Sequence, residues 1–543
     1  MVQGRSLKAY YFIFITSALL AVLLFTNLGN QFLWQDEAEN AVIAQNILEY
    51  GYPRAFDGNL LVISDIGYRK NYTWIFQPWL QNYVTAASFY VLGKSTFSAR
   101  FPFVLFAIAS FILSFFLAKR LFTNRIANIS SALLLACVPF LLMSRQARYY
   151  TAVLFLALLL IYYYLDYAEG KRFSEIKIIV TSFLLFNTNF GIFFPLAGAL
   201  IFHYAFFNFR KERLKNNLAV IFIIFAVTLP VFIFFKGWMH KAPLSWSFVV
   251  GNIKFYLRSI NKYVAPIRIL FLFYAGFVLV KRKFVPWKEN NECSKNLWLI
   301  AIICFFTISF MGAAKFRSLR YVLYLVPLII ILESYILDRW FRRNKTLPVI
   351  CIAILITTNF FNTVLTDTIL STSSKAVVWL DSKYFGFSKQ NTATRYIFEK
   401  IQEKSVEDPG PRSYLTDYLY EITHDYDGPI ECIVRYLNKN AKKNDAVMTP
   451  YGDCALAFYT ELKVDNRMHS EKYVYPEWII PRQYWIPQDF YNSSYFKEIQ
   501  KKYDKIVLNC PDLRWENRPD DLGCHNFRTV TDYPHKVTIY KKR

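Results

Sequence analysis

The sequence lacks several features that define other classes of protein. None of its eight cysteines stands in the C-x-x-C spacing of a zinc site. It has no internal repeat and no low-complexity segment. Acidic residues are few, because 39 Asp and Glu stand against 63 Lys and Arg, which gives a net charge of +24.

In a soluble domain, this basic excess would indicate nucleic acid as a partner. Here much of it lies in short loops between long apolar runs, where the bias toward cationic cytoplasmic loops accounts for it. Hydrophobic residues make up 55% of the chain and aromatic residues 19%. Apolar runs of roughly 20 residues recur. We therefore predict a polytopic α-helical protein of the plasma (inner) membrane, in contact with membrane lipids and not with nucleic acid.

The first apolar run, 10–29, follows Arg5 and Lys8, as the core of a signal peptide would. Its apolar stretch is long for a signal peptide, however, and no small-x-small cleavage site precedes Trp34. The run is therefore interpreted as a retained first span.

Five basic clusters between the runs, at 119–125, 171–172, 210–215, 281–283 and 339–345, predict the topology. All of them become cytoplasmic if the N-terminus is inside and about eleven spans bring the C-terminus outside. The predicted spans are 10–29, 98–118, 126–143, 149–167, 175–188, 190–208, 217–235, 267–281, 297–312, 321–338 and 346–365. The count stays open by about two, since "FNTNFG" between the fifth and sixth spans fits either a tight outer turn or a break in one re-entrant helix.

Two long regions are predicted to lie outside, in addition to the shorter outer loops between spans. The first extracytoplasmic loop, 30–97, includes the short stretch 78–93, whose Gln81 and Asn82 favour a helix in the outer interface. From residue 366 to 543, charge rises and long apolar runs disappear. Strand-like runs at 445–452, 503–510 and 535–542 alternate with helix-like stretches at 392–403 and 429–442.

The residues 366–543 are therefore predicted to form an extracytoplasmic α/β domain, after a transmembrane domain at 1–365. It contains four cysteines: Cys432, Cys454, Cys510 and Cys524. In an oxidising compartment one or two disulfides are possible, and the three pairings stay open.

An acidic pair, Asp36 and Glu37, follows the first span at once. Asp36 and Glu39 have the spacing of a helix capping box, and Gly51 with Pro53 supplies the stop signal of the same helix. A carboxylate at the membrane boundary is also suited to act as a general base. The two roles are compatible, because a cap would hold the carboxylate in one orientation.

Cations in the outer loops run against the orientation bias. They snorkel to lipid phosphates in one interpretation and bind an anionic ligand, such as a lipid-borne phosphate, in the other. The residues that would bind this anion are Lys70 of the aromatic-rich first loop, Arg145, Arg148, His240, Lys241, Arg317 and Arg320.

Four stretches together resemble the GT-C membrane glycosyltransferases. They are "WQDEAENAVIAQNILEYGYP", "WIFQPWLQNYVTAASFYVLGKSTFSARFP", "SRQARYYTA" and "RSLRYVLYLVP". Within that group the chain is most similar to the dolichyl-phosphate-mannose protein mannosyltransferase and lipid A aminoarabinose transferase type. The resemblance covers about residues 8–365.

The resemblance implies an inverting transfer of a sugar from a polyprenyl phosphate to a cell-envelope acceptor, a glycan, lipid or protein, on the extracytoplasmic side. Asp36 would activate the acceptor and Glu37 would help to hold the substrate. Arg145, Arg148, Arg317 and Arg320 would bind the donor phosphate. Tyr149, in the same motif as Arg148, would be a further substrate contact.

The chain departs from the family at Phe76-Gln77-Pro78-Trp79, where relatives carry a Glu-Lys or a His before Pro-Pro. Lys70 or a different loop would have to replace that phosphate-contacting lysine. No metal and no cofactor are expected, because arginines can offset the charge of a monophosphate; the D-x-D-like "HDYDG" at 424–428 lies among turn residues.

The alternative function is a transporter or flippase for an anionic lipid-linked substrate. Such a protein should show ionisable residues within its spans and paired repeats. The predicted spans are mostly free of charge, so the transferase is preferred.

The topology can be tested with single cysteines at Lys241 and Lys283. The first position is predicted to lie outside and the second in a cytoplasmic basic loop. A membrane-impermeant thiol reagent added to intact cells should label only the cysteine at 241. Labelling of both positions from outside would show that the span count is wrong.

Overall fold

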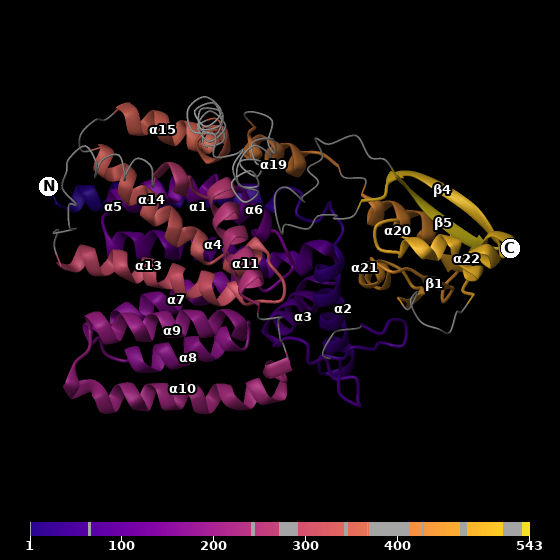
Figure 1. Ribbon diagram of the computed structural model, residues 1–543, viewed down its shortest axis with the longest axis horizontal. Helices are drawn as coiled ribbons and strands as arrows, with labels where there is room; N and C mark the ends of the chain where they lie inside the picture. The colour runs from indigo at the N-terminus through magenta and orange to yellow at the C-terminus, as the bar shows by residue number, and fades with distance from the viewer. Residues whose placement is uncertain are drawn as a thin grey trace, which may run out of the picture.

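The computed structural model describes residues 2–62, 67–239, 245–270, 291–341, 346–365, 368, 412–425, 428–466, 475–513 and 535–543. Long helices that run alongside one another form one part of the molecule, and a smaller α/β region forms the other (Figure 1). Helices α2 (Gln35–Tyr50) and α3 (Leu80–Leu92) lie between them (Figure 1).

The helical part follows from the apolar runs, because a chain in lipid must satisfy its backbone hydrogen bonds internally. Its helices are α1 (Val2–Phe25), α4 (Thr96–Leu121), α5 (Asn124–Leu135), α6 (Val138–Ser144), α7 (Tyr150–Glu169), α8 (Ser174–Phe186), α9 (Phe190–Phe207), α10 (Leu214–Phe234), α11 (Trp246–Tyr263), α13 (Asn291–Gly312), α14 (Leu325–Phe341) and α15 (Thr346–Thr357). Local signals set their ends. Ser95 and Ser98, for example, form a reciprocal capping box where α4 begins.

Helices lie at ten of the eleven predicted spans, and the eighth, 267–281, falls mostly outside the described residues. Five described helices are long and apolar enough to cross a membrane, or six if α5 and α6 form one bent span. These two helices meet at 66°, with Cys137 and Pro139 at the break. Proline has no N–H to continue the ladder of α5. The total of eleven spans stays a prediction.

The join between the fifth and sixth predicted spans is a short turn. Helix α8 ends at Phe186, and the side chain of Asn189 caps α9 by accepting from the Ile192 N–H at 3.1 Å. The two helices contact each other and lie side by side (Figure 1). This arrangement agrees with the tight turn and not with a break in one helix.

The α/β region contains a five-stranded sheet in the order β2-β1-β3-β5-β4. Its strands are β1 (Ala446–Met448), β2 (Lys463–Asp465), β3 (Trp478–Ile479), β4 (Tyr503–Pro511) and β5 (Lys536–Lys542). Strand β1 pairs in parallel with β2 and β3, whereas β5 pairs antiparallel with β3 and β4.

Helices α20 (Pro429–Asn440), α21 (Asp453–Tyr459) and α22 (Ser494–Lys502) accompany the sheet (Figure 1). The strands predicted at 445–452, 503–510 and 535–542 are therefore confirmed as β1, β4 and β5, and the helix at 429–442 as α20. The predicted helix at 392–403 and the boundary at 366 lie outside the described residues.

The hydrophobic core does not follow the predicted division of the chain. Buried residues of α2, α3 and the first loop form one cluster with those of α20, α21 and the sheet. Helix α19 (Tyr414–Thr423) instead packs into the core of the long helices, and its Tyr418 hydroxyl donates to the Leu23 carbonyl at 3.0 Å. The first loop and the α/β region are thus one packed body.

Hydrogen bonds also join the segment before α2 to the α/β region. The Phe32 N–H donates to Glu431 at 2.8 Å, and the Leu33 N–H to the Tyr459 hydroxyl at 2.9 Å. The rings of Phe32 and Tyr459 are stacked with centroids 4.1 Å apart. The segment that enters α2 is therefore held by α20 and α21.

Cys432 of α20 and Cys510 of β4 form a disulfide, with Cα atoms 6.5 Å apart and 78 residues between them in sequence. Cys454 is buried and free, and Cys524 lies outside the described residues. One of the possible disulfides is therefore present.

Cys432→Ser is expected to destabilise the α/β region. The disulfide lowers the entropy of the unfolded chain, and for a loop of this length that stabilises the folded state by about 4 kcal/mol. Thermal unfolding of purified protein, with and without reductant, measures the effect. Cys293→Ser, at a free cysteine of α13, is the control. An equal effect of reductant on the wild type and on Cys432→Ser would contradict the assignment.

Candidate functional site

Helix α2 carries the acidic pair in its first turn. It begins at Gln35, its N-cap residue is Trp34, and no side chain caps it. The prediction that Asp36 caps this helix through a box with Glu39 is therefore wrong, because the N-cap lies two residues earlier, at Trp34, and Asp36 is inside the helix. The predicted stop is confirmed: Gly51 has φ of 79° and donates its N–H to the Ile47 carbonyl at 2.8 Å.

The carboxylate of Asp36 faces arginines from two other elements. Its Oδ2 atom lies 2.9 Å from Nη1 of Arg320 and 3.9 Å from Nη2 of Arg148. The Asp36 side chain is 29% exposed, whereas those of Arg320 and Arg148 are 11% and 7% exposed. The structure therefore brings together three residues that are up to 284 positions apart in sequence.

Arg320 is held by its neighbours. It lies in the short helix η3 (Leu319–Val322), and it donates to the hydroxyls of Tyr150 at 3.0 Å and Tyr321 at 3.2 Å. Burial lowers the pKa of Arg320, but Tyr150, Tyr321 and Asp36 outweigh it and raise the pKa well above its usual value. The guanidinium is therefore a fixed cation beside Asp36.

Arg148 links Asp36 to Glu39. Its Nη1 donates to the backbone carbonyl of Asp36 at 2.9 Å and to Oε1 of Glu39 at 3.2 Å. Burial raises the pKa of Glu39 to about 7, although Arg148 lowers it in part. Burial also lowers the pKa of Arg148, but Asp36 and Glu39 raise it above its usual value. Glu39 thus titrates near neutral pH while Arg148 stays charged.

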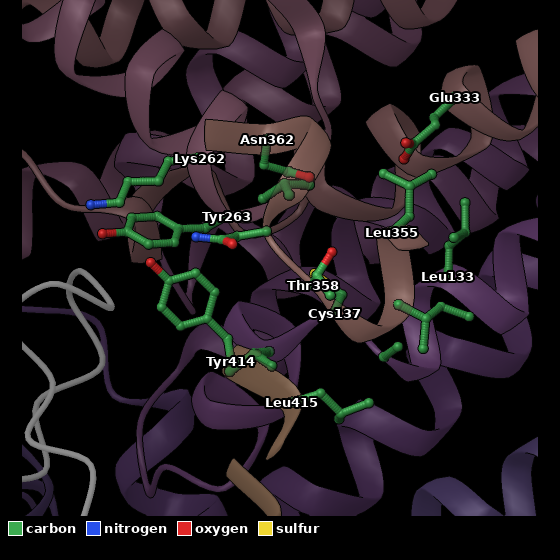
Figure 2. Close-up of a pocket in the computed structure, with 15 residues that line it drawn as sticks. Leu133, Cys137, Lys262, Tyr263, Glu333, Leu355, Thr358, Asn362, Tyr414 and Leu415 are labelled. Atoms are coloured by element: carbon green, nitrogen blue, oxygen red, sulfur yellow. The ribbon is translucent and has the colours of Figure 1, made fainter. Parts of the chain in front are cut away.

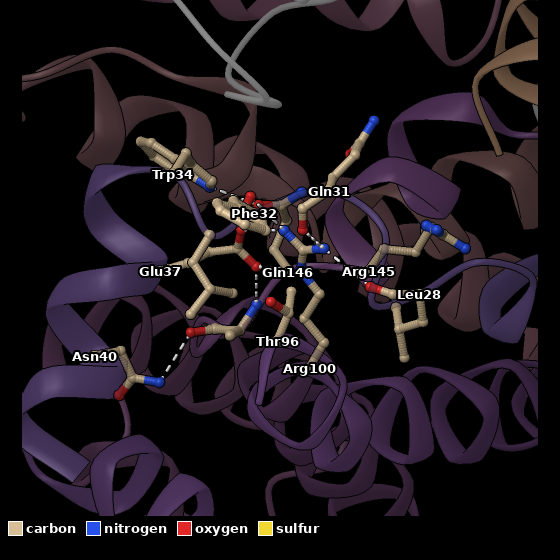
Figure 3. A network of polar contacts seen from close by, with 12 residues as sticks. Leu28, Gln31, Phe32, Trp34, Glu37, Asn40, Thr96, Arg100, Arg145 and Gln146 are labelled. Atoms are coloured by element: carbon tan, nitrogen blue, oxygen red, sulfur yellow. Dashed lines mark hydrogen bonds and ion pairs between the residues drawn. The ribbon is translucent and has the colours of Figure 1, made fainter. Parts of the chain in front are cut away.

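Glu37 lies beside Arg100 (Figure 3), and its side chain is fully buried. Both of its oxygens accept from Arg100, at 2.9 and 2.7 Å, and Oε1 also accepts from the Ala147 N–H at 2.6 Å. Arg100 further donates to the carbonyls of Leu28, Gln31 and Phe32. Glu37 therefore joins the end of α1, the start of α2, α4 and the loop before α7.

Arg145 also serves the end of α1. It donates to the carbonyls of Leu24 and Thr26, each at 2.8 Å, and more weakly to those of Leu23 and Asn27. These are carbonyls that a helix end leaves without an intrahelical partner. Arg145 is 9% exposed. The structure therefore separates it from the neighbouring Arg148, which faces Asp36.

The remaining predicted residues are dispersed. Tyr149 is buried, lies beside the Arg148 guanidinium and donates its N–H to Gln81 at 2.9 Å. Arg317 is exposed and lies over the ring of Phe255. Lys70 is exposed in the first loop. His240 and Lys241 lie outside the described residues.

Sequence reasoning missed Arg100, Tyr150 and Tyr321 and interpreted Glu39 only as part of a cap. Arg100 gave a signal, because it is a charged residue inside a predicted span, and such residues need a partner. The two tyrosines lie in the quoted stretches "SRQARYYTA" and "RSLRYVLYLVP", but no pattern there distinguishes them from the other tyrosines of the chain. Among the described residues, no group of three or more His, Cys, Asp or Glu side chains could hold a metal ion.

Asp36, Glu39, Arg148 and Arg320 together form the Asp36 cluster. A cavity of about 260 Å³ adjoins it, where α2 and the first loop meet the α/β region. Its lining residues are Gln35, Glu39, Val62, Pro450, Asp453, Cys454 and Asn466. Glu39 therefore belongs both to this cavity and to the Asp36 cluster.

A second cavity lies at the break between α5 and α6 (Figure 2). Glu333 lines one side and Lys262 the other (Figure 2), and its volume is about 60 Å³. Among the described residues, Oε1 of Glu333 and Nδ2 of Asn359 have no hydrogen-bond partner. The space holds about two water molecules, so it is too small for a sugar or a lipid head group.

Comparisons with known proteins identify solved structures with the same fold. The fold is that of ArnT from Cupriavidus metallidurans: its apo crystal structure superimposes with a TM-score of 0.60 over 98% of both chains, at 14% identity. The structure of the same protein bound to undecaprenyl phosphate gives 0.58 over 97% of both chains, at 15% identity. The chain thus shares the fold of ArnT over nearly its whole length.

The family model of dolichyl-phosphate-mannose-protein mannosyltransferases matches residues 77–234. An uncharacterized protein of Aquifex aeolicus (strain VF5) is 24% identical over 355 residues, which span 61% of this chain and 64% of that relative. The predicted resemblance to GT-C glycosyltransferases is therefore confirmed, by the fold over the whole chain and by the family match over its segment.

Glu37→Gln is expected to lower the free energy of unfolding by about 3–5 kcal/mol, because it leaves the buried charge of Arg100 without its counter-ion. The melting temperature in detergent and the protein yield from membranes measure this loss. Glu49→Gln, at an exposed position of the same helix, should leave both unchanged. A stable Glu37→Gln protein would show that the pair is not structural.

Proposed function

We propose that this protein is an inverting glycosyltransferase that moves a sugar from a polyprenyl-phosphate donor to a cell-envelope acceptor on the extracytoplasmic side. The observation that carries the proposal is the half-buried Asp36 carboxylate, held beside Arg320 and Arg148 on a helix just outside the first apolar run. The likeness to ArnT, one of whose structures contains undecaprenyl phosphate, supports a lipid-phosphate donor.

In the proposed reaction, the oxygen or nitrogen of the acceptor attacks the anomeric carbon from the face opposite the phosphate. The bond between that carbon and the phosphate oxygen breaks, and the electron pair leaves with the lipid phosphate. Asp36 takes the proton of the acceptor. Configuration inverts because the reaction is one displacement.

Arg320 is proposed to bind the leaving phosphate. Its Nη1 already holds the Asp36 anion at 2.9 Å, and a phosphate oxygen offers the same charge and geometry. The charge that develops on the leaving group would meet a cation that Tyr150 and Tyr321 hold in place. Arg148 would orient Asp36 by donating a hydrogen bond to the backbone carbonyl of Asp36.

The other predicted residues are assigned different roles in this proposal. Glu37 and Arg145 act by positioning, since their side chains bind Arg100 and the end of α1 and not Asp36. Arg317 and Lys70 are exposed cations suited to lipid phosphates. His240 and Lys241 stay candidates from the sequence alone.

An extracytoplasmic position of the α/β region is part of the proposal. The disulfide between Cys432 and Cys510 supports it, because structural disulfides persist in oxidising compartments. Since α2 and the α/β region share one hydrophobic cluster, the site and that region would face the same side of the membrane.

Asp36→Asn should abolish transfer, with a fall of about 10²–10⁴-fold if the loss is that of a general base. The gene is deleted, and surface glycans, lipids and proteins are compared by mass analysis after complementation with the wild type or the variant. The variant should express normally, bind undecaprenyl phosphate and restore no product.

Arg320→Ala should instead weaken the binding of undecaprenyl phosphate itself.

Asp489→Asn, at an exposed position of the α/β region, is the control for complementation and should restore the product fully. Full complementation by Asp36→Asn would end the catalytic assignment, and a deletion strain with an unchanged surface would argue against the proposed function.

A further inference from the structure

The cavity between α2 and the α/β region is a built polar site. Two amides and two carboxylates line it, those of Gln35, Asn466, Glu39 and Asp453, together with Val62, Pro450 and Cys454. Its volume of about 260 Å³ corresponds to roughly eight or nine water molecules, so it has room for one sugar ring.

One wall of the cavity is held rigidly by hydrogen bonds. The carboxylate of Asp453 accepts from Nε2 of Gln35 at 2.6 Å and from Nδ2 of Asn466 at 2.7 Å. Oε1 of Gln35 in turn accepts from the Gly452 N–H at 3.1 Å. The wall therefore joins the helix of the Asp36 cluster to the α/β region across the cavity.

Gly452 makes this contact possible. Its φ of 86° lies in the left-handed region, and a Cβ atom there would lie 2.5 Å from Ile430 Cδ1. The turn places Asp453 at the start of α21, with its carboxylate toward Gln35.

Glu39 connects this cavity to the Asp36 cluster. It stands three residues after Asp36 on α2, so the two side chains emerge on the same face of the helix. Arg148 holds Oε1 of Glu39 at 3.2 Å, and among the described residues no group binds Oε2. The Glu39 side chain is 17% exposed and lines the cavity.

The described residues differ in charge between the two sides of the site. Arg320 and Arg148 lie beside Asp36, whereas the described residues that line the cavity beyond Glu39 include two carboxylates and no lysine or arginine. A phosphate would be repelled from the carboxylates, and a ligand that donates hydrogen bonds would be attracted. The thiol of Cys454 is no nucleophile, because burial raises its pKa well above its usual value.

We propose that this cavity is the acceptor subsite, where Glu39 and the amide wall around Asp453 bind the hydroxyls of a saccharide and present one of them to Asp36. That the bound saccharide is the acceptor rests on the proposed function. The binding of a saccharide in this cavity does not depend on it. In this arrangement the α/β region supplies acceptor recognition, and Glu39 is a binding residue beside the base.

The pH dependence follows from the surroundings of Glu39. Burial raises its pKa to about 7, Arg148 lowers it, and Asp36 and Asp453 raise it. The carboxylate accepts more hydrogen bonds when it is ionised, so saccharide affinity should rise with pH through about 7. The Glu39→Gln variant should lose this dependence.

The test uses the purified full-length protein in detergent and a panel of monosaccharides: glucose, galactose, N-acetylglucosamine and glucosamine. Saturation-transfer NMR measures their binding. The wild type and Asp36→Asn should bind at least one neutral sugar, and Glu39→Gln and Asp453→Asn should lose at least ten-fold in affinity. Glu49→Gln and Asp489→Asn are the matched controls and should bind like the wild type.

Two further measurements keep the outcomes apart. Undecaprenyl phosphate binding should stay unchanged in Glu39→Gln, whose side chain has nearly the same shape. The melting temperature should fall less than in Glu37→Gln, because Arg148 keeps Asp36 as a counter-ion. In the transfer assay, this variant should raise the KM for the acceptor at least ten-fold while kcat changes less than three-fold.

Absence of sugar binding by the wild type, or undiminished binding by Glu39→Gln, would overturn the proposal whether or not transfer is found. Binding of glucosamine alone would show a site for cations instead, and competition by inorganic phosphate would show a donor site. Saccharide binding without transfer would keep the subsite and reject the proposed function.

Discussion

The ion pair between Arg100 and Glu37 is the interaction on which the site depends. Arg100 uses its guanidinium for both oxygens of Glu37 and for three backbone carbonyls of the segment that leaves α1. Glu37 also accepts a hydrogen bond from the Ala147 N–H, which lies in the loop before α7. Because Asp36 is the preceding residue and Arg148 follows Ala147 directly, this pair determines where both of them lie.

The two acidic neighbours therefore have opposite environments. Glu37 is removed from solvent and its charge is fully used within the protein, whereas Asp36 is 29% exposed and faces arginines that could also bind a ligand. A buried charge is costly unless it is paired, so one carboxylate is suited to fixing structure and the other to chemistry. Glu39, one helical turn later, extends the site toward the α/β region.

The packing explains how that region can take part. Residues of α2 and the first loop share a hydrophobic cluster with the sheet, and a hydrogen bond joins the Val464 N–H of β2 to the Asn59 carbonyl of the first loop at 2.9 Å. A wall of the cavity is thus built from residues more than 400 positions apart, such as Gln35 and Asp453. Motion of the α/β region would change this cavity directly.

The sequence alone determined the helices of the membrane part and most of the strands of the α/β region. Apolar runs and basic loops report the cost of placing polar groups in lipid, and that cost acts locally along the chain. The same patterns identified the Asp36 segment as special. They also gave the N-cap residue of α2 wrongly: the local spacing predicts a capping box, whereas Asp36 and Glu39 face arginines from distant parts of the chain.

Only the tertiary structure decided which of the candidate cations meet Asp36. Arg145 and Arg148 are three residues apart and looked equivalent, yet one binds the end of α1 and the other binds Asp36 and Glu39. A guanidinium is directed by the carbonyls and carboxylates that packing brings within about 3 Å, and these come from distant parts of the chain. For the same reason the cavity behind Glu39 has no signature in the sequence: its two halves meet only when α2 packs against α21.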